Sequence, residues 1–231
     1  MNQSLQTTPG FAGSGALAVD RNRVLRNTYW LLALSLLPTV LGAWVGVATG
    51  ITAQMGMGVS LIVFLAGSFG LIYAIERTKE SSTGVYVLLA FTFFMGLMLS
   101  RLIAQVLGFR NGTSLVMTAF GGTAVVFFAM ASMATVIKRD LSGMGKFLFV
   151  GALIVFIGFI ANFFLQSSAL MLTLLVVCLG IFSAFMLYDI KRVVDGGETN
   201  YVSATLAIYL DVFNVFQSLL ALLGIFGGER D

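Results

Sequence analysis

Histidine is absent from this sequence, and cysteine and proline are scarce. The 231 residues include no histidine, two prolines and a single cysteine, Cys178. Without histidine, we exclude zinc chemistry and rhomboid-type chemistry, both of which would need imidazole here. One cysteine excludes a disulfide within the chain. Because Cys178 lies in an apolar stretch, we interpret it as a packing residue.

Charged residues are also too few for a water-soluble surface. Only 10% of the residues are charged and 58% are apolar, with a mean hydropathy of +0.99, whereas an ordinary globular domain is about a quarter charged. The composition therefore predicts an integral membrane protein, whose first partner is the lipid bilayer. We expect no nucleic-acid partner and no cofactor.

The apolar residues come in runs of about 20, which is the length of a helix that crosses the hydrocarbon core. The alternation of a transmembrane barrel is absent. The sequence predicts an all-α polytopic membrane protein, a seven-transmembrane-helix bundle. The expected spans are Thr28–Ala48, Gln54–Ile75, Gly84–Leu107, Thr113–Ile137, Phe147–Leu165, Ser168–Ile190 and Ser203–Phe226, with a tight hairpin at Gln166 and Ser167.

The first 27 residues contain no apolar run that could form the core of a signal peptide. We predict a flexible cytoplasmic tail over residues 1–27 and a single transmembrane domain over residues 28–231. Basic residues indicate the orientation, because cytoplasmic loops carry more of them. Ten fall on the side of the tail, against Arg110 and Arg230 on the other, and Arg101 within a span is expected to snorkel to the interface. We expect a cytoplasmic N-terminus and an external, periplasmic C-terminus.

An aspartate interrupts the apolar run LAIYLDVFNVF over residues 206–216. A carboxylate in the bilayer costs roughly 2.5 to 3.5 kcal/mol on insertion scales, so such groups usually face the bundle interior or a water-filled cavity. We expect Asp211 to face inward. Asn214 and Ser218, three and seven residues later, fall on the same side of a helix.

A second carboxylate, Asp189, closes the sixth expected span. That span runs inward and the last runs outward, so Asp189 and Asp211 could meet in the cytoplasmic half of the bundle. Two carboxylates that share a site hold one proton between them and titrate as a unit. In a chain without histidine, such a pair is the candidate for gating near neutral pH. The alternative is structural: Asp189 as a helix-end residue and Asp211 as a hydrogen-bonding group that fixes helix packing.

Several motifs resemble one family over nearly the whole chain after the tail. They are AFGGTAVVFFA in the fourth span, LYDIKR at the end of the sixth, GGETNY in the following loop and YLDVFN in the seventh. Together they resemble the Bax inhibitor-1 family, also called the transmembrane Bax inhibitor motif family, and GGETNY points to its bacterial branch.

The resemblance implies a place in the bacterial inner (plasma) membrane and a pH-sensitive calcium leak channel. Asp189 and Asp211 match the family's di-aspartyl pH sensor and would contact calcium weakly and transiently as the permeant ion. Arg77, in AIERTKE, is the nearest match to a basic gate partner, and Asn214 is a second candidate. The alternative function is a non-conducting modulator of a membrane-anchored AAA protease.

Enzyme classes fit the residues less well. Intramembrane aspartyl proteases place a glycine directly before the second aspartate, where this chain has Leu210. Retinal proteins need a Schiff-base lysine in the last helix, and no lysine occurs between Ser203 and Phe226. We therefore predict that the protein is not an enzyme.

Overall fold

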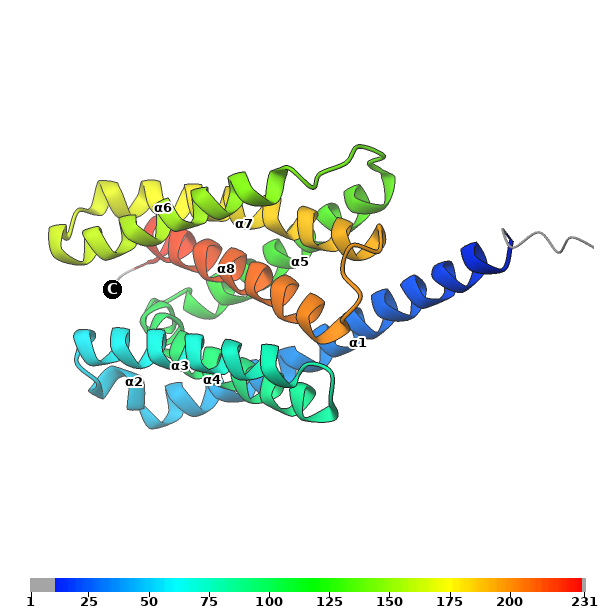
Figure 1. The fold of residues 1–231 in the computed structure, drawn as a ribbon. Coiled ribbons are helices and arrows are strands. Elements are labelled where there is room, and N and C mark those ends of the chain that lie inside the picture. Colours follow the sequence, from blue (N-terminus) through cyan, green and yellow to red (C-terminus); the bar gives the residue numbers. More distant parts are fainter. Residues whose placement is uncertain (1–10, 230–231) are drawn as a thin grey trace, which may run out of the picture.

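Seven long helices and one short helix make up the described chain. The computed structural model describes residues 11–229. For residues 11–20 and for Met57 it describes the backbone only. In residues 11–229 there is no strand. The helices are α1 (Phe11–Thr49), α2 (Ile51–Gln54), α3 (Met57–Thr78), α4 (Ser82–Leu107), α5 (Gly112–Val136), α6 (Met144–Leu165), α7 (Ser168–Val194) and α8 (Tyr201–Gly227) (Figure 1).

The seven long helices confirm the predicted all-α, seven-span architecture, since each is long and apolar enough to cross a membrane. The hairpin between α6 and α7 is also present. Gln166 adopts the left-handed conformation (φ 50°) directly after α6. The Ser167 hydroxyl then accepts a hydrogen bond from the backbone N–H of Leu170 at 3.3 Å and caps α7. Two residues are thus enough to reverse the chain.

Helix α1 differs from the sequence prediction. We expected a flexible tail up to residue 27, but residues 11–27 continue the first span as one helix that begins at Phe11. This stretch is rich in Ala, Leu and Arg, which favour helix, and contains no proline. Residues 1–10 of the expected tail lie outside the described part. A second difference is α2, because Gln54, expected to open the second span, instead ends this short helix.

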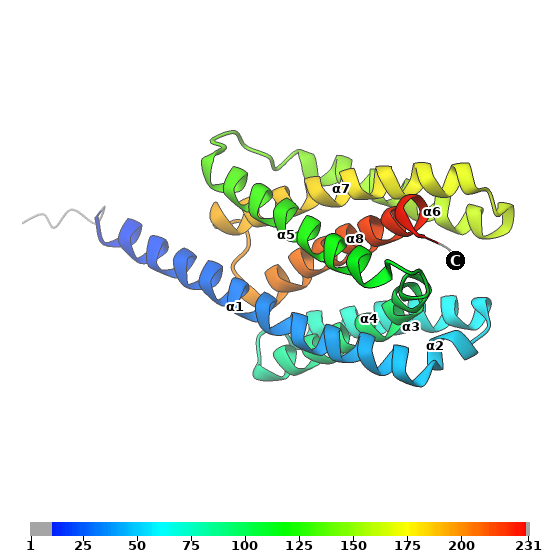
Figure 2. The ribbon, with the colours of Figure 1, turned by 180° about the vertical axis from the view of Figure 1, so that it is seen from behind.

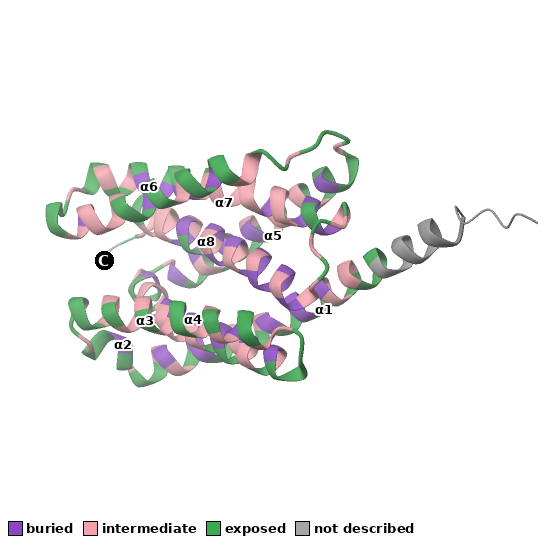
Figure 3. Cartoon of the chain, in the orientation of Figure 1, coloured by how far each residue is buried: buried purple, intermediate pink, exposed green. Residues whose placement is uncertain are grey.

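Helix α8 lies at the centre of the bundle. It packs against α7, α5, α1, α4 and α3, and the two opposite views show it between the α6–α7 hairpin and the α1–α4 group (Figures 1 and 2). Buried positions are frequent along it, whereas α3 and α6 have few buried positions (Figure 3). The Tyr209 hydroxyl lies 2.9 Å from Thr39 Oγ1 of α1. The helix that carries Asp211 is therefore held on several sides.

Helices α1 and α4 cross closely at two glycines. A Cβ atom on Gly96 of α4 would overlap the carbonyl oxygen of Thr39 and lie 2.9 Å from its Cα. A Cβ on Gly42 of α1 would overlap the carbonyl oxygen of Phe93. Contacts between small residues are the usual way in which membrane helices approach this closely. This crossing sets the position of α4 against the core.

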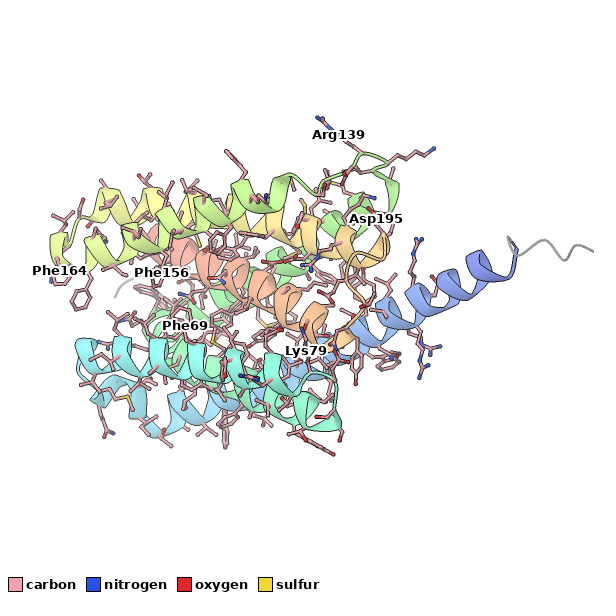
Figure 4. All side chains as sticks on the ribbon, in the orientation of Figure 1. Phe69, Lys79, Arg139, Phe156, Phe164 and Asp195 are labelled. Atoms are coloured by element: carbon pink, nitrogen blue, oxygen red, sulfur yellow. The ribbon has the colours of Figure 1, made fainter. Side chains whose placement is uncertain are left out.

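Helix α6 lies at the periphery and packs chiefly on α7. Its Phe164 is 76% exposed, and Figure 4 shows this side chain at the end of the bundle opposite Lys79, Arg139 and Asp195. In a membrane, such apolar side chains face lipid. Lys79, Arg139 and Asp195 thus lie together at the end of the bundle away from Phe164.

Candidate functional site

The structure brings Asp189 of α7 and Asp211 of α8 together, with a hydrogen-bond contact between their side chains. Asp211 is 3% exposed, and Asp189 is half-buried. The pair lies near the end where α7 stops and α8 starts, since Asp211 is ten residues after Tyr201, about 15 Å along the helix. The expected meeting of the two carboxyl groups therefore occurs, while their role as a pH sensor stays a prediction.

Asp211 has one oxygen without a protein partner. Its Oδ2 atom is buried and accepts no hydrogen bond from any described group. A buried polar atom without a partner costs about 1 to 3 kcal/mol, and more when it is charged. The cost falls if the pair carries a proton, because a protonated carboxyl group donates to its neighbour. The geometry thus favours one proton shared between the two acids.

A cavity of about 350 Å³ leads to the pair from the nearby end of the bundle. It lies among α3, α7, the α7–α8 loop and α8, and Asp189 lines it, whereas Asp211 lies behind. Its lining residues are Glu76, Lys79, Asp189, Arg192, Val193, Glu198, Ser203, Ala204, Leu206, Ala207 and Leu210. Charged groups from three segments therefore surround the route to the acids.

Two ion pairs form the rim of this cavity. Lys79 Nζ donates to Glu76 at 2.7 Å, and Arg192 donates to Glu198 at 3.1 Å. The hydrogen bond to Glu76 raises the pKa of the Lys79 ammonium above its ordinary value, so Lys79 keeps its charge where carboxyl groups titrate. The Ser203 hydroxyl donates to Glu76 at 3.0 Å and joins α8 to α3.

Asn200 joins the α7–α8 loop to the α3–α4 loop. Its side-chain oxygen accepts from the backbone N–H groups of Val202 (2.9 Å) and Ser203 (3.1 Å) and so caps α8. Its amide nitrogen donates to the Lys79 carbonyl oxygen at 3.2 Å and to Glu80 at 3.1 Å. One side chain thus starts the central helix and holds the end of α3.

Replacement of Asn200 by alanine is therefore expected to lower stability by about 1 to 2 kcal/mol, the usual effect of losing a helix cap. Unfolding in mixed micelles, followed by tryptophan fluorescence, measures this loss. Thr199→Ala is the matched control, because the exposed Thr199 bonds Glu198 only through its backbone N–H. Equal stabilities of the two variants would contradict the capping role.

The other two predicted site residues do not reach the pair. Arg77 is exposed, donates from Nε to the Tyr73 hydroxyl at 2.9 Å and stacks on the Tyr73 ring. Its neighbours Glu76 and Lys79 line the cavity instead. These two residues are three apart and so share one face of the helix, whereas Arg77 projects from a different face. The Asn214 amide donates to the carbonyl oxygen of Leu210 at 2.8 Å. Neither residue has a hydrogen bond to an aspartate of the pair in the described chain.

The arrangement suits proton binding better than tight metal binding. Among the side chains that the structure describes, no three of the types that ligate metals come together as a metal site. Calcium prefers six to eight oxygen ligands, so two aspartates offer only part of a coordination shell. What the pair offers is two carboxyl groups close enough to share a proton, one of which lines the cavity.

Sequence reasoning missed several residues that line the cavity or hold its neighbouring loops together. Glu198 and Asn200 belong to the GGETNY motif, and the asparagine directly before Tyr201 was a readable capping signal. Glu76 and Lys79 share a face by their spacing. Ser203 carried no signal in the sequence, because its role depends on how α3 lies against α8.

A family model described as "Inhibitor of apoptosis-promoting Bax1" matches residues 21–228. The chain is 37% identical over 206 residues to the "Modulator of FtsH protease YccA" of Escherichia coli strain K12, covering 89% of this chain and 91% of that one. It is 35% identical over 217 residues to an uncharacterized protein of Neisseria meningitidis serogroup A, with 93% and 96% covered. A membrane protein of Vibrio cholerae is 35% identical over 220 residues, with 94% and 97% covered.

Proposed function

Because this chain belongs to the Bax inhibitor-1 family, we propose that it is a bacterial inner-membrane protein that modulates a membrane-anchored AAA protease of the FtsH type. The observation that carries the proposal is the similarity, at 37% identity over nearly the full length, to a relative named as a modulator of that protease. Its counterpart in Escherichia coli O6:H1, also 37% identical over 206 residues, is named "Inner membrane protein YccA". The protein acts without catalysing a reaction, in line with these names and with Leu210 before Asp211.

Binding to the protease is tested by co-purification from membranes. Full-length protein is expected to retain the protease and to slow the degradation of a membrane substrate. A variant lacking residues 2–20 keeps Arg21, whose guanidinium donates to the Val194 carbonyl oxygen at 2.7 Å, and so leaves the end of α7 intact. We expect this deletion to weaken retention of the protease. Failure of the full-length protein to retain the protease or to alter degradation would contradict the proposal.

A second candidate function is a pH-sensitive calcium leak, and the Asp189–Asp211 contact favours it. The two acids lie behind a cavity lined by charged groups, at a depth where an unpaired carboxylate is costly. Loss of the shared proton would place two negative charges on the path of a cation. Purified protein in liposomes contains no protease, so calcium flux that varies with pH supports the leak. Absence of calcium flux at every pH would exclude the leak and leave protease modulation as the one proposed function.

The proposed orientation places the charged end of the bundle in the cytoplasm and the C-terminus in the periplasm. Lys79, Arg139 and Asp195 lie at that end (Figure 4), and basic residues favour the cytoplasmic side. Alkaline phosphatase fused after Asp231 is expected to be active, and the same fusion after Thr199, in the α7–α8 loop, inactive. The reverse pattern of activities would mean that the chain is inverted.

A further inference from the structure

A second cavity, of about 330 Å³, lies at the opposite end of the bundle from the aspartate pair. The end of α1, the short helix α2 and the last turns of α4 form it, and small residues such as Gly46, Gly50 and Ala104 leave the space open. The polar side chains that line it include Arg101 and Gln105, one helical turn apart on α4. Two donor side chains thus point to one recess.

Arg101 has no counter-charge in this recess. Its guanidinium makes no ion pair and no hydrogen bond with any described residue, and no acidic side chain lines the cavity. The nearby hydroxyls of Thr52 and Ser100 bond each other at 2.7 Å, and Ser100 also donates to the Leu97 carbonyl oxygen. Arg101 and Gln105 therefore remain as the side-chain donors for an external acceptor.

The position of Arg101 matches the depth of lipid headgroups. Helix α4 has 26 residues, or about 39 Å, against a hydrocarbon core of about 30 Å. Arg101 lies six residues before Leu107, so a centred helix places its Cα about 5 Å below the edge of the core. A guanidinium that snorkels along the helix reaches the phosphate layer from there.

We propose that Arg101 and Gln105 bind the phosphodiester of a phospholipid in the leaflet at this end of the bundle. Guanidinium and phosphate form bidentate, charge-assisted hydrogen bonds. The acyl chains find apolar surface on the core side of the recess, because Val40 and Trp44, which share a face of α1 with the lining residue Val47, are 62% and 67% exposed. The occupant is thus a lipid, whose tails this surface accommodates, and not a free anion. The site does not depend on the function proposed above.

Native mass spectrometry of the delipidated full chain, titrated with dioctanoyl phosphatidylglycerol, tests the site. Arg101→Gln is expected to raise the dissociation constant for the first bound lipid about tenfold, the effect of losing a charged hydrogen-bond donor. Gln105→Leu is expected to raise it about threefold. Arg101→Lys keeps the charge and is expected to bind better than Arg101→Gln. The matched control is Arg110→Gln, which removes an exposed basic residue outside the recess and leaves binding unchanged.

Two competitors identify the part of the lipid that is recognised. Dioctanoylglycerol, which lacks the phosphate, is expected to bind much more weakly, and inorganic phosphate is expected not to displace the lipid. Equal binding of dioctanoylglycerol would show an apolar site, and displacement by phosphate would show a free-anion site; either result overturns the proposal. Wild-type affinity in folded Arg101→Gln and Gln105→Leu proteins, or an equal loss in Arg110→Gln, overturns it as well.

Discussion

Asp211→Asn is expected to flatten the pH dependence of calcium flux through this protein. Two ionised carboxylates about 4 Å apart repel by about 4 kcal/mol at an effective dielectric of about 20, whereas one shared proton replaces the repulsion with a hydrogen bond. Asparagine keeps the shape and a donor for Asp189 but cannot ionise. The variant should therefore stay in the packing of the protonated pair at every pH.

Asp189→Asn is expected to have the same effect, and the double variant should add little, because the pair acts as one unit. The measurement is calcium flux in proteoliposomes from about pH 5 to about pH 8, the range in which a chain with histidine would titrate. Asp195→Asn is the matched control, since Asp195 lies outside the cavity in a pair with Lys191. Wild-type pH profiles in both single variants would rule out the pair as a sensor.

A distance measurement separates the switch from conduction. Spin labels attached to cysteines that replace Ser81 and Thr199, both exposed near the cavity, report the distance between the α3–α4 loop and the α7–α8 loop. With the native Cys178 replaced by serine, this spacing is expected to change with pH in the wild-type pair and to stay constant in Asp211→Asn. A constant spacing in both proteins would mean that protonation leaves this end of the bundle unmoved.

Gly96→Ala is expected to destabilise the bundle by about 2 kcal/mol, the upper end of the usual overpacking cost less the gain in helix propensity. One added carbon would overlap the Thr39 carbonyl oxygen on α1, so the two backbones must separate, and overpacking of this kind costs about 1 to 3 kcal/mol. Alanine favours a helix over glycine by about 1 kcal/mol, which offsets only part of the loss. Unfolding in mixed micelles measures the difference.

Gly70→Ala is the control for this substitution. Gly70 lies within α3, and a Cβ built there meets no atom within 4 Å. The same chemical change should therefore be neutral or slightly stabilising at Gly70. If both variants lost stability equally, the effect would come from the helix backbone and not from the α1–α4 crossing.

Periodicity and length were enough to predict the seven spans, because each apolar run must match the thickness of the bilayer. They could not show where α1 begins. A helix that leaves the membrane needs no further apolar residues, and residues 11–27 continue as helix on propensity. The short helix α2 was missed for a related reason, since four residues are too few to form a periodic pattern.

The candidate site was predictable where a side chain has a high free-energy cost in the membrane. Asp189 and Asp211 stand out because a carboxylate is expensive in lipid, and antiparallel neighbours place them at the same end. Arg77 contacts Tyr73 and not the pair, because sequence proximity does not identify the helix face, and Glu76 and Lys79 occupy the cavity face instead. The unpaired oxygen of Asp211 and the link from Ser203 to Glu76 depend on three-dimensional packing.

The peripheral position of α6 gives this helix a topological role. It packs chiefly on α7, so it adds little to the core, but it adds one crossing to the chain. Removal of a single crossing would invert α7 and α8 relative to the first five helices. The Asp189–Asp211 pair would then face the end that holds Arg101, far from Glu76 and Lys79. The number of crossings supplied by α6 is thus what puts the two acids and the Glu76–Lys79 pair at the same end of the bundle.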